Sequence, residues 1–240
     1  MKNKIRELKN WDNKTWLSSS AYINSFNTFL LKKKNLNKNS QILDIGCGRG
    51  KIFGVLSRKV KLLNKPIGID PVTHKDVDKS IDFRNEDVFK FFKNNKIKFD
   101  LIMIKQTLHF FNKDKRSKLI KVCKNNLKKN GVLVIFSLIT LNNEIPCFKL
   151  MKQKLSRGLE RDSIMIKSTF KILKNYKIDK FKFKVSISKS KYIQMLRKKY
   201  ISCLINLNKD QINKGIKEIK DTYPNKILFK DILICVKYKS

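Results

Sequence analysis

Three glycines on alternate positions interrupt an apolar run in the segment QILDIGCGRGKIFGVL, residues 41–56. The residues before them are typical of a buried strand, and after them apolar residues return at helical spacing. Glycine has no Cβ atom and adopts positive φ readily, so the backbone can turn tightly and bring its amides against a ligand. We therefore expect a strand at 41–45, a ligand-binding turn at 46–50 and a helix at 51–60.

Strand and helix patterns alternate over the first 140 residues. FDLIMI and GVLVIFSL are almost continuously apolar, which is typical of strands buried on both faces of a parallel sheet. The alternation predicts right-handed βαβ units and an α/β fold with a doubly wound, mostly parallel sheet. Strands are expected at 41–45, 65–70, 81–87, 99–104 and 131–138, and helices at 21–33, 51–60, 88–93 and 112–128. For the last helix, Asn112 is the expected N-cap and Gly131 lies just beyond the expected end.

The pattern changes after residue 140. Helical segments are expected at 145–175 and, as a lysine-rich pair, at 190–222. Alternation of Lys with Phe and Val in KFKFKVSIS predicts a strand at 180–188 with one exposed face, and ILICVKYK predicts another at 232–239. Because no repeat or low-complexity linker separates these parts, we expect one domain over residues 1–240.

The chain has an extreme excess of positive charge: 56 Lys and Arg against 19 Asp and Glu, a formal net charge of +37. Such a charge attracts nucleic acids, anionic membranes and acidic metabolites. However, the basic residues are spread along the whole chain, and few are arginine, which nucleic-acid sites favour. The abundance of Lys, Asn, Ile and Phe also matches AT-rich codons. A dispersed solvated surface is the simpler interpretation, and a nucleic-acid partner is the alternative.

The sequence also argues against several classes of protein. No window reaches the roughly 18 apolar residues of a membrane span, and residues 1–10 lack the apolar core of a signal peptide, so a cytoplasmic protein is expected. The cysteines form no C-x-x-C pair, so we expect neither a metal cluster nor a disulfide framework. They are Cys47, Cys123, Cys147, Cys203 and Cys235.

Two acidic residues flank the glycine turn and indicate which ligand it binds. Asp70 ends the next expected strand, at the position where a carboxylate can accept both hydroxyls of a ribose. The glycines Gly46, Gly48 and Gly50 follow a G-x-G-x-G spacing rather than the G-x-G-x-x-G of pyrophosphate-binding turns. Asp44, just before them, disfavours a diphosphate and favours a cation such as a sulfonium with an ammonium group. The segment therefore predicts a cationic adenosine compound.

These motifs resemble those of class I S-adenosylmethionine-dependent methyltransferases. ILDIGCGRG resembles the first motif of that family, IGID the second and NEDVF the third, while FDLIMIKQTLHFF and LKKNGVLVIFSL resemble its fourth and fifth strands. The resemblance covers about residues 20–140 and is nearest to the small-molecule branch of ubiquinone-biosynthesis and trans-aconitate methyltransferases. It implies a Rossmann-like sheet of seven strands ending in an antiparallel pair, S-adenosyl-L-methionine as cofactor, and S-adenosyl-L-homocysteine as product.

The resemblance also implies a division of the domain and a set of cofactor contacts. Residues 1–35 are expected to form a helical lid, 36–140 the cofactor-binding core, and 141–240 cap helices with the final strands. The implied cofactor-binding residues are Asp44, Gly46, Gly48, Gly50, Asp70, Pro71, Asp87, Val88, Lys105 and Gln106.

Several candidate residues have two interpretations. Asp87 either recognises adenine or caps the helix that follows it. His109, after the fourth strand, is either a substrate ligand and general base or a structural residue. Trp11 and Trp16 either close over the site or pack on the first helix. Tyr192, Arg197 and Tyr200 either line a substrate pocket or are ordinary residues of a cap helix. The candidate substrate-binding residues are Trp16, Tyr22, His109, Tyr192, Arg197 and Tyr200.

The leading hypothesis is methyl transfer to a small-molecule or lipid-like acceptor by in-line displacement, and the positive charge favours an anionic acceptor. Methylation of RNA or DNA is the first alternative. Against it, the loop KQTLHF lacks the Asn/Asp-Pro-Pro-aromatic motif that holds the amino group of a flipped base. A non-catalytic protein that keeps the cofactor fold is the second alternative. The sequence leaves the oligomeric state open.

Overall fold

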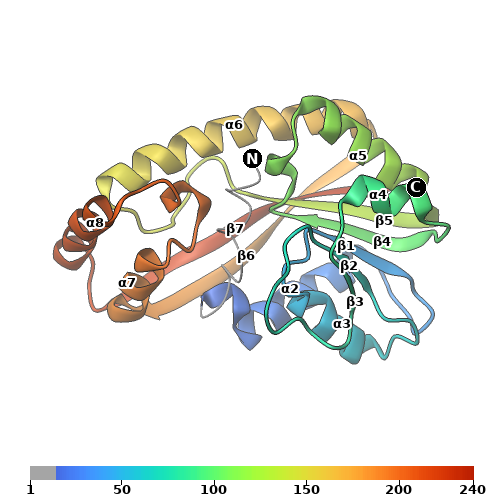
Figure 1. Cartoon of the computed structure of the whole chain (residues 1–240), viewed down its shortest axis with the longest axis horizontal. Coiled ribbons are helices and arrows are strands. Elements are labelled where there is room, and N and C mark those ends of the chain that lie inside the picture. The colour runs from blue at the N-terminus through green and yellow to red at the C-terminus, as the bar shows by residue number, and fades with distance from the viewer. Residues whose placement is uncertain (1–14) are drawn as a thin grey trace.

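A seven-stranded sheet in the order β3-β2-β1-β4-β5-β7-β6 organises the computed structural model, which describes residues 15–240 (Figure 1). The first five strands run parallel, β7 is antiparallel to β5, and β6 is antiparallel to β7. The predicted fold class is thereby confirmed. The strands are β1 (Ile42–Ile45), β2 (Ile67–Ile69), β3 (Asp82–Arg84), β4 (Phe99–Lys105), β5 (Leu127–Leu138), β6 (Tyr176–Ser188) and β7 (Lys226–Lys239).

Helices cover both faces of the sheet (Figure 1). One hydrophobic core joins α2, α3, α7 and α8 to the sheet, and a second joins α4, α5 and α6 to its other face. The α-helices are α2 (Ser20–Lys33), α3 (Lys51–Val60), α4 (Val88–Asn94), α5 (Lys113–Asn125), α6 (Lys149–Leu173), α7 (Lys189–Arg197) and α8 (Lys209–Thr222). Short 3-10 helices are η1 (Trp16–Ser18), η2 (Leu108–Phe110) and η3 (Ser202–Leu204). Within residues 15–240, no helix has the length and apolar content to cross a bilayer.

The expected boundary between the fourth helix and the fifth strand was wrong. Asn112 does cap α5, since its Oδ1 accepts from the Lys115 amide at 2.9 Å. The helix ends at Asn125, however, and β5 begins at Leu127, well before Gly131. Pairing of Leu127 with Phe99 on β4 extends the strand backwards, and a partner so distant in sequence is not visible in local periodicity.

The final two strands are longer than expected and reach past the rest of the sheet. They pair continuously from Tyr176–Tyr238 to Ser188–Lys226, whereas the last pair between β5 and β7 is Leu138–Leu233. The paired strands β6 and β7 thus project beyond the edge at which β5 ends. Helices α7 and α8 pack on this projection and lie beyond the carboxyl ends of the parallel strands (Figure 1). The carboxyl ends of the parallel strands therefore face the side of the molecule on which α7 and α8 lie.

Candidate active site

The glycine turn follows β1 directly and is held against β2. The amide of Gly46 donates to the carbonyl of Ile69 at 2.8 Å, and Gly46 has a φ of +75°. A Cβ atom on Gly46 would lie 2.1 Å from Oγ1 of Thr107, in the loop after β4. Only glycine lets these two loops approach so closely with this backbone conformation.

Asp70 lies beside the glycine turn, as the sequence predicts. Its Oδ2 accepts from the Gly48 amide at 2.9 Å, and its Oδ1 accepts from the Val72 amide at 2.9 Å. Nε2 of His74 lies 3.5 Å from Oδ1, so the carboxylate is fixed from three sides. An ionised carboxylate has about four acceptor positions, and those left over can accept ribose hydroxyls. The next residue, Pro71, is exposed.

Asp44 is buried near the end of β1 with one carboxylate oxygen unsatisfied. Its side chain is 4% exposed, and among the described residues Oδ1 has no hydrogen-bond partner. Burial raises the pKa of Asp44 to about 7, nearby Lys105 opposes this rise, and Asp70 adds to it. A buried acid with a free oxygen gains free energy when a cation binds beside it. This geometry fits a ligand that carries an ammonium or sulfonium group.

Asp87 is observed as the N-cap of α4. Its Oδ1 accepts from the amides of Phe89 at 2.8 Å and Lys90 at 3.4 Å, and the residue is exposed. Val88 is buried in the second hydrophobic core. The interpretation of Asp87 as a helix cap is thus confirmed, while recognition of adenine stays a prediction.

Substitution of Asp87 separates its two roles. We expect Asp87→Ala to lower the free energy of unfolding by about 1 kcal/mol, because two amides of α4 lose their acceptor. If Asp87 also recognises adenine, S-adenosylhomocysteine affinity falls in calorimetry, whereas Asn112→Ala, which removes the cap of α5, leaves that affinity unchanged. Equal affinities in both variants would contradict the adenine role.

Lys105 is the last residue of β4, and Gln106 and Thr107 begin the loop after it. Gln106 has a φ of +51°, and its amide donates to the carbonyl of Phe136 at 2.9 Å. A non-glycine residue in this region carries strain, which clusters at functional sites. Nζ of Lys105 lies 5.6 Å from the ring centroid of Tyr22. Thr107 thus lies against the glycine turn, and Lys105 lies near Tyr22 on α2.

His109 lies farther along the same loop, within η2. It is exposed, and its ring centroid is 4.1 Å from that of Phe110. This contact involves neither the glycine turn nor Asp70, so the catalytic role of His109 stays a prediction.

An aromatic cluster formed by Trp16, Tyr192 and Tyr200 lies under the cap helices. The rings of Trp16 and Tyr200 are 5.3 Å apart between centroids, and the hydroxyls of Tyr192 and Tyr200 are 2.9 Å apart. The structure thus brings together three of the predicted substrate-binding residues. Arg197 is exposed on α7, away from the buried face that carries Tyr192. Trp11 lies outside the described residues.

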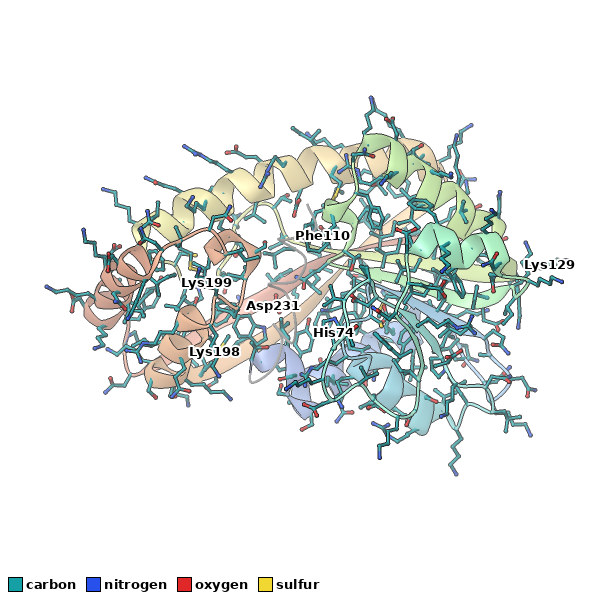
Figure 2. The ribbon with its side chains drawn as sticks, in the orientation of Figure 1. His74, Phe110, Lys129, Lys198, Lys199 and Asp231 are labelled. Carbon is teal, nitrogen blue, oxygen red and sulfur yellow. The ribbon has the colours of Figure 1, made fainter. Side chains whose placement is uncertain are left out.

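Asp231 is a candidate site residue that the sequence analysis missed. It is 2% exposed, and its Oδ2 accepts from Nε1 of Trp16 at 2.9 Å. Figure 2 shows it between the ribbon of α7 and the carboxyl ends of the parallel strands. The only signal in the sequence is one acidic residue inside the apolar strand segment ILFKDILICV.

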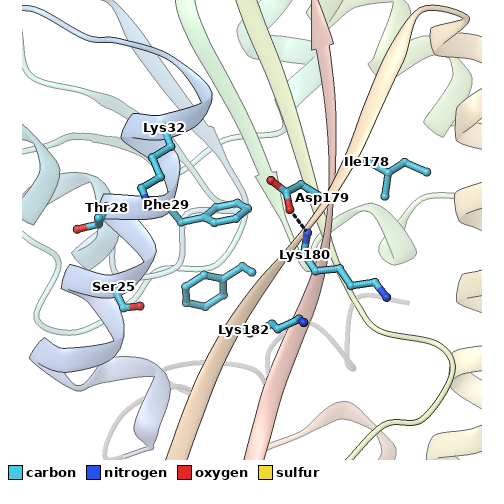
Figure 3. Close-up of a pocket in the computed structure, with 9 residues that line it drawn as sticks. Ser25, Thr28, Phe29, Lys32, Ile178, Asp179, Lys180 and Lys182 are labelled. Carbon is cyan, nitrogen blue, oxygen red and sulfur yellow. Dashed lines mark hydrogen bonds between the residues drawn. The ribbon is translucent and has the colours of Figure 1, made fainter.

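A groove between α2 and β6 lies away from these residues (Figure 3). It has a volume of about 760 Å³, and Lys33 and Asp179 form an ion pair beside it. Strands β4, β5 and β7 separate β6 from the glycine turn after β1, so this groove is not part of the candidate site. Its lining residues are Ser25, Thr28, Phe29, Lys32, Ile178, Asp179, Lys180, Phe181 and Lys182.

Comparison with known proteins agrees with this geometry. Residues 43–135 match a family described as "Methyltransferase domain". The chain is 31% identical over 121 residues to a carboxy-S-adenosyl-L-methionine synthase of Helicobacter pylori (strain HPAG1), covering 47% of this chain and 49% of that protein. The chain thus spans about half the length of this curated relative.

Solved structures show the same fold at low sequence identity. A candidate methyltransferase from an antibiotic biosynthesis pathway of Anabaena variabilis has a TM-score of 0.61 and 15% identity, covering 88% of this chain and 95% of that one. The plantazolicin methyltransferase BpumL, in complex with a monoazolic desmethylPZN analogue and SAH, has a TM-score of 0.52 and 16% identity. That match covers 96% of this chain and 88% of BpumL.

Proposed function

We propose that this chain, which belongs to the class I S-adenosylmethionine-dependent methyltransferases, transfers a methyl group to a small-molecule acceptor by in-line displacement. The observation that carries the proposal is the arrangement of Asp44, Gly46 and Asp70 at the carboxyl ends of β1 and β2. The assignment to the ubiquinone-biosynthesis and trans-aconitate branch stays a prediction.

Each residue of this arrangement has a distinct task in binding the cofactor. Asp70 accepts hydrogen bonds from the ribose hydroxyls, and the glycine turn lets the ligand lie against backbone amides. Asp44 offers its unsatisfied carboxylate oxygen to the ammonium group. The cofactor supplies an already activated methyl group on a sulfonium. The protein therefore needs chiefly to orient the acceptor and to exclude water.

The surroundings of the site support a small acceptor. Trp16, Tyr192 and Tyr200 are buried beneath α7 and α8, which gives an enclosed apolar wall rather than an open groove. Ligand sites of this kind combine apolar walls with a few polar groups. A polymer such as RNA requires an open path to the methyl group, so the net charge alone does not favour it.

The proposal is tested by binding and by product analysis. Calorimetry is expected to show binding of S-adenosylmethionine and S-adenosylhomocysteine. With methyl-labelled S-adenosylmethionine, label is expected in the low-mass fraction of a cell extract and absent from added RNA. Label in RNA would overturn the small-molecule acceptor, and failure to bind either nucleoside would overturn the enzymatic assignment. Mass spectrometry of the nucleoside product also detects a carboxylated cofactor, the product that the name of the Helicobacter relative implies.

The raised pKa of Asp44 predicts a pH dependence of cofactor affinity. The folded-state pKa of about 7 lies above the ordinary value of 3.8, so below pH 7 the ligand-free carboxyl holds a proton that cation binding must displace. We expect S-adenosylmethionine affinity to rise with pH, by up to about tenfold per unit, until pH 7 and then to level off.

The control for this prediction is Asp44→Asn, which keeps the shape but cannot ionise. Its affinity is expected to be weaker at pH 7.5 and to change much less between pH 5.5 and 7.5. The residues around position 44 are unchanged in this variant, so a pH dependence with another origin persists in it. Parallel pH profiles for the two proteins would contradict the role of Asp44.

A further inference from the structure

Five buried or half-buried residues form a polar cluster beside the candidate site: Trp16, Tyr22, Asp44, Lys105 and Asp231. Side chains two positions apart on a strand point to the same face of a sheet. Asp44 follows Ile42 in this way, Lys105 follows Met103, and Asp231 precedes Leu233; those three apolar residues all belong to the core that contains α2. The three charged residues of the polar cluster thus lie on one face of the sheet.

A series of side-chain contacts on this face of the sheet runs from the proposed cofactor site to the cap helices. Asp231 on β7 is paired with Phe183 on β6, whose ring lies edge-on to that of Tyr22 with centroids 5.1 Å apart. Lys105 lies on the other side of Tyr22, at 5.6 Å from its ring centroid. Trp16 donates to Asp231 and contacts Tyr200 and Phe229 with its ring edges. Asp231 thus has aromatic neighbours in Trp16, to which it is hydrogen-bonded, and Phe183, with which it is paired.

The polar cluster contains hydrogen-bonding groups that the described residues leave unused. Tyr22 is fully buried, with 0% exposure. Its hydroxyl has no hydrogen-bond partner among residues 15–240. Trp16 uses only Oδ2 of Asp231. Buried polar groups normally find partners, so unused ones point to a ligand or ordered water. Burial and the charge of Asp231 also raise the pKa of Tyr22, which keeps the hydroxyl protonated.

The charge of the polar cluster is opposite to that of the chain. Two carboxylates, Asp44 and Asp231, face one ammonium, Lys105, in a protein with 56 basic and 19 acidic residues. Burial raises the pKa of Asp231, and the Trp16 hydrogen bond and Lys105 oppose this rise. With both acids ionised, this buried cluster carries a net negative charge, which repels carboxylates and phosphates and favours groups that donate hydrogen bonds.

We propose that Oδ1 of Asp231 and the hydroxyl of Tyr22 bind the methyl acceptor, and that the acceptor presents an amine or hydroxyl on an aromatic body. The inference rests on the proposed function, since it takes the neighbouring crevice as the cofactor site. It differs from the expectation of an anionic acceptor, because the charge of the polar cluster is opposite in sign to the formal net charge of +37 of the chain. Asp231 and Tyr22 are accordingly residues that determine acceptor specificity.

Binding of two matched probes tests the inference. Calorimetry with the full chain, saturated with S-adenosylhomocysteine, compares 2-phenylethylamine with phenylacetate. The amine is expected to bind at least about tenfold more tightly, as a charge-assisted hydrogen bond predicts. Asp231→Asn keeps an acceptor for Trp16 but removes the charge, and is expected to lose at least about tenfold in amine affinity. Asp221→Asn, on the exposed side of α8, is the matched control and is expected to bind like the native chain.

The outcomes separate this inference from the proposed function. Equal or tighter binding of phenylacetate, no binding of the amine, or unchanged amine affinity in Asp231→Asn would each overturn the acceptor subsite. If circular dichroism shows that Asp231→Asn does not fold, Tyr22→Phe decides instead, and native amine affinity in that variant overturns the inference. Loss of S-adenosylhomocysteine binding with the amine preference retained would refute the cofactor site alone.

Discussion

Alanine in place of Gly46 is expected to lower the free energy of unfolding by about 2–4 kcal/mol and to abolish measurable cofactor binding. The φ of +75° is unfavourable for any residue with a side chain. In addition, the new Cβ atom would lie 2.1 Å from Oγ1 of Thr107, so the loop after β4 must move. Both loops that surround the proposed cofactor would then shift. Urea denaturation and calorimetry measure the two effects.

Gly48 supplies a matched control for this substitution. It also has a positive φ, of +55°, but a Cβ atom there would meet nothing within 4 Å. Gly48→Ala is therefore expected to lower the free energy of unfolding by about 1 kcal/mol, because only the unfavourable backbone conformation contributes. Adding Thr107→Ala to Gly46→Ala removes the two nearest colliding atoms and is expected to restore part of the lost stability. Equal losses in Gly46→Ala and Gly48→Ala would show that the contact with Thr107 is unimportant.

Replacement of Asp70 by alanine is expected to weaken binding of S-adenosylhomocysteine at least about 100-fold. The proposed ligand loses hydrogen bonds from two ribose hydroxyls to a charged group, each worth about 1.5–3 kcal/mol. The amides of Gly48 and Val72 lose their acceptor as well, so the glycine turn is less well ordered. Calorimetry at a temperature where both proteins are folded measures the change.

Two further variants make the interpretation of Asp70 specific. Asp82→Ala removes an acid paired with Arg84 on β3 and is expected to leave cofactor affinity unchanged. Asp70→Asn keeps one oxygen acceptor and is expected to be intermediate between the native chain and Asp70→Ala. If Asp70→Ala binds the nucleoside as the native chain does, the ribose lies elsewhere and the proposed cofactor site is wrong.

Local features of the sequence were sufficient for the cofactor side of the site. Asp44, Gly46 and Asp70 were predictable because each lies at the end of an apolar strand, and the carboxyl ends of parallel strands meet at one edge. The almost continuously apolar sequences of β4 and β5 likewise predicted that these strands lie in the interior of the sheet. In both cases each residue is identified from neighbours within a few positions of it, so local composition and spacing carry the information.

The residues on the acceptor side of the site could be identified only from the tertiary structure. Trp16 and Asp231 are separated by 215 positions. They meet only because strands β6 and β7 extend past β5, which places Asp231 near the cap helices. The burial that raises the pKa of Asp44 and Asp231 is also absent from any local pattern. The sequence by itself thus determined the parallel sheet, the glycine turn and its two flanking acids, since strand periodicity and turn chemistry are local. Only the tertiary structure decided which polar groups face one another across the cap, because long-range strand pairing and desolvation depend on the whole fold.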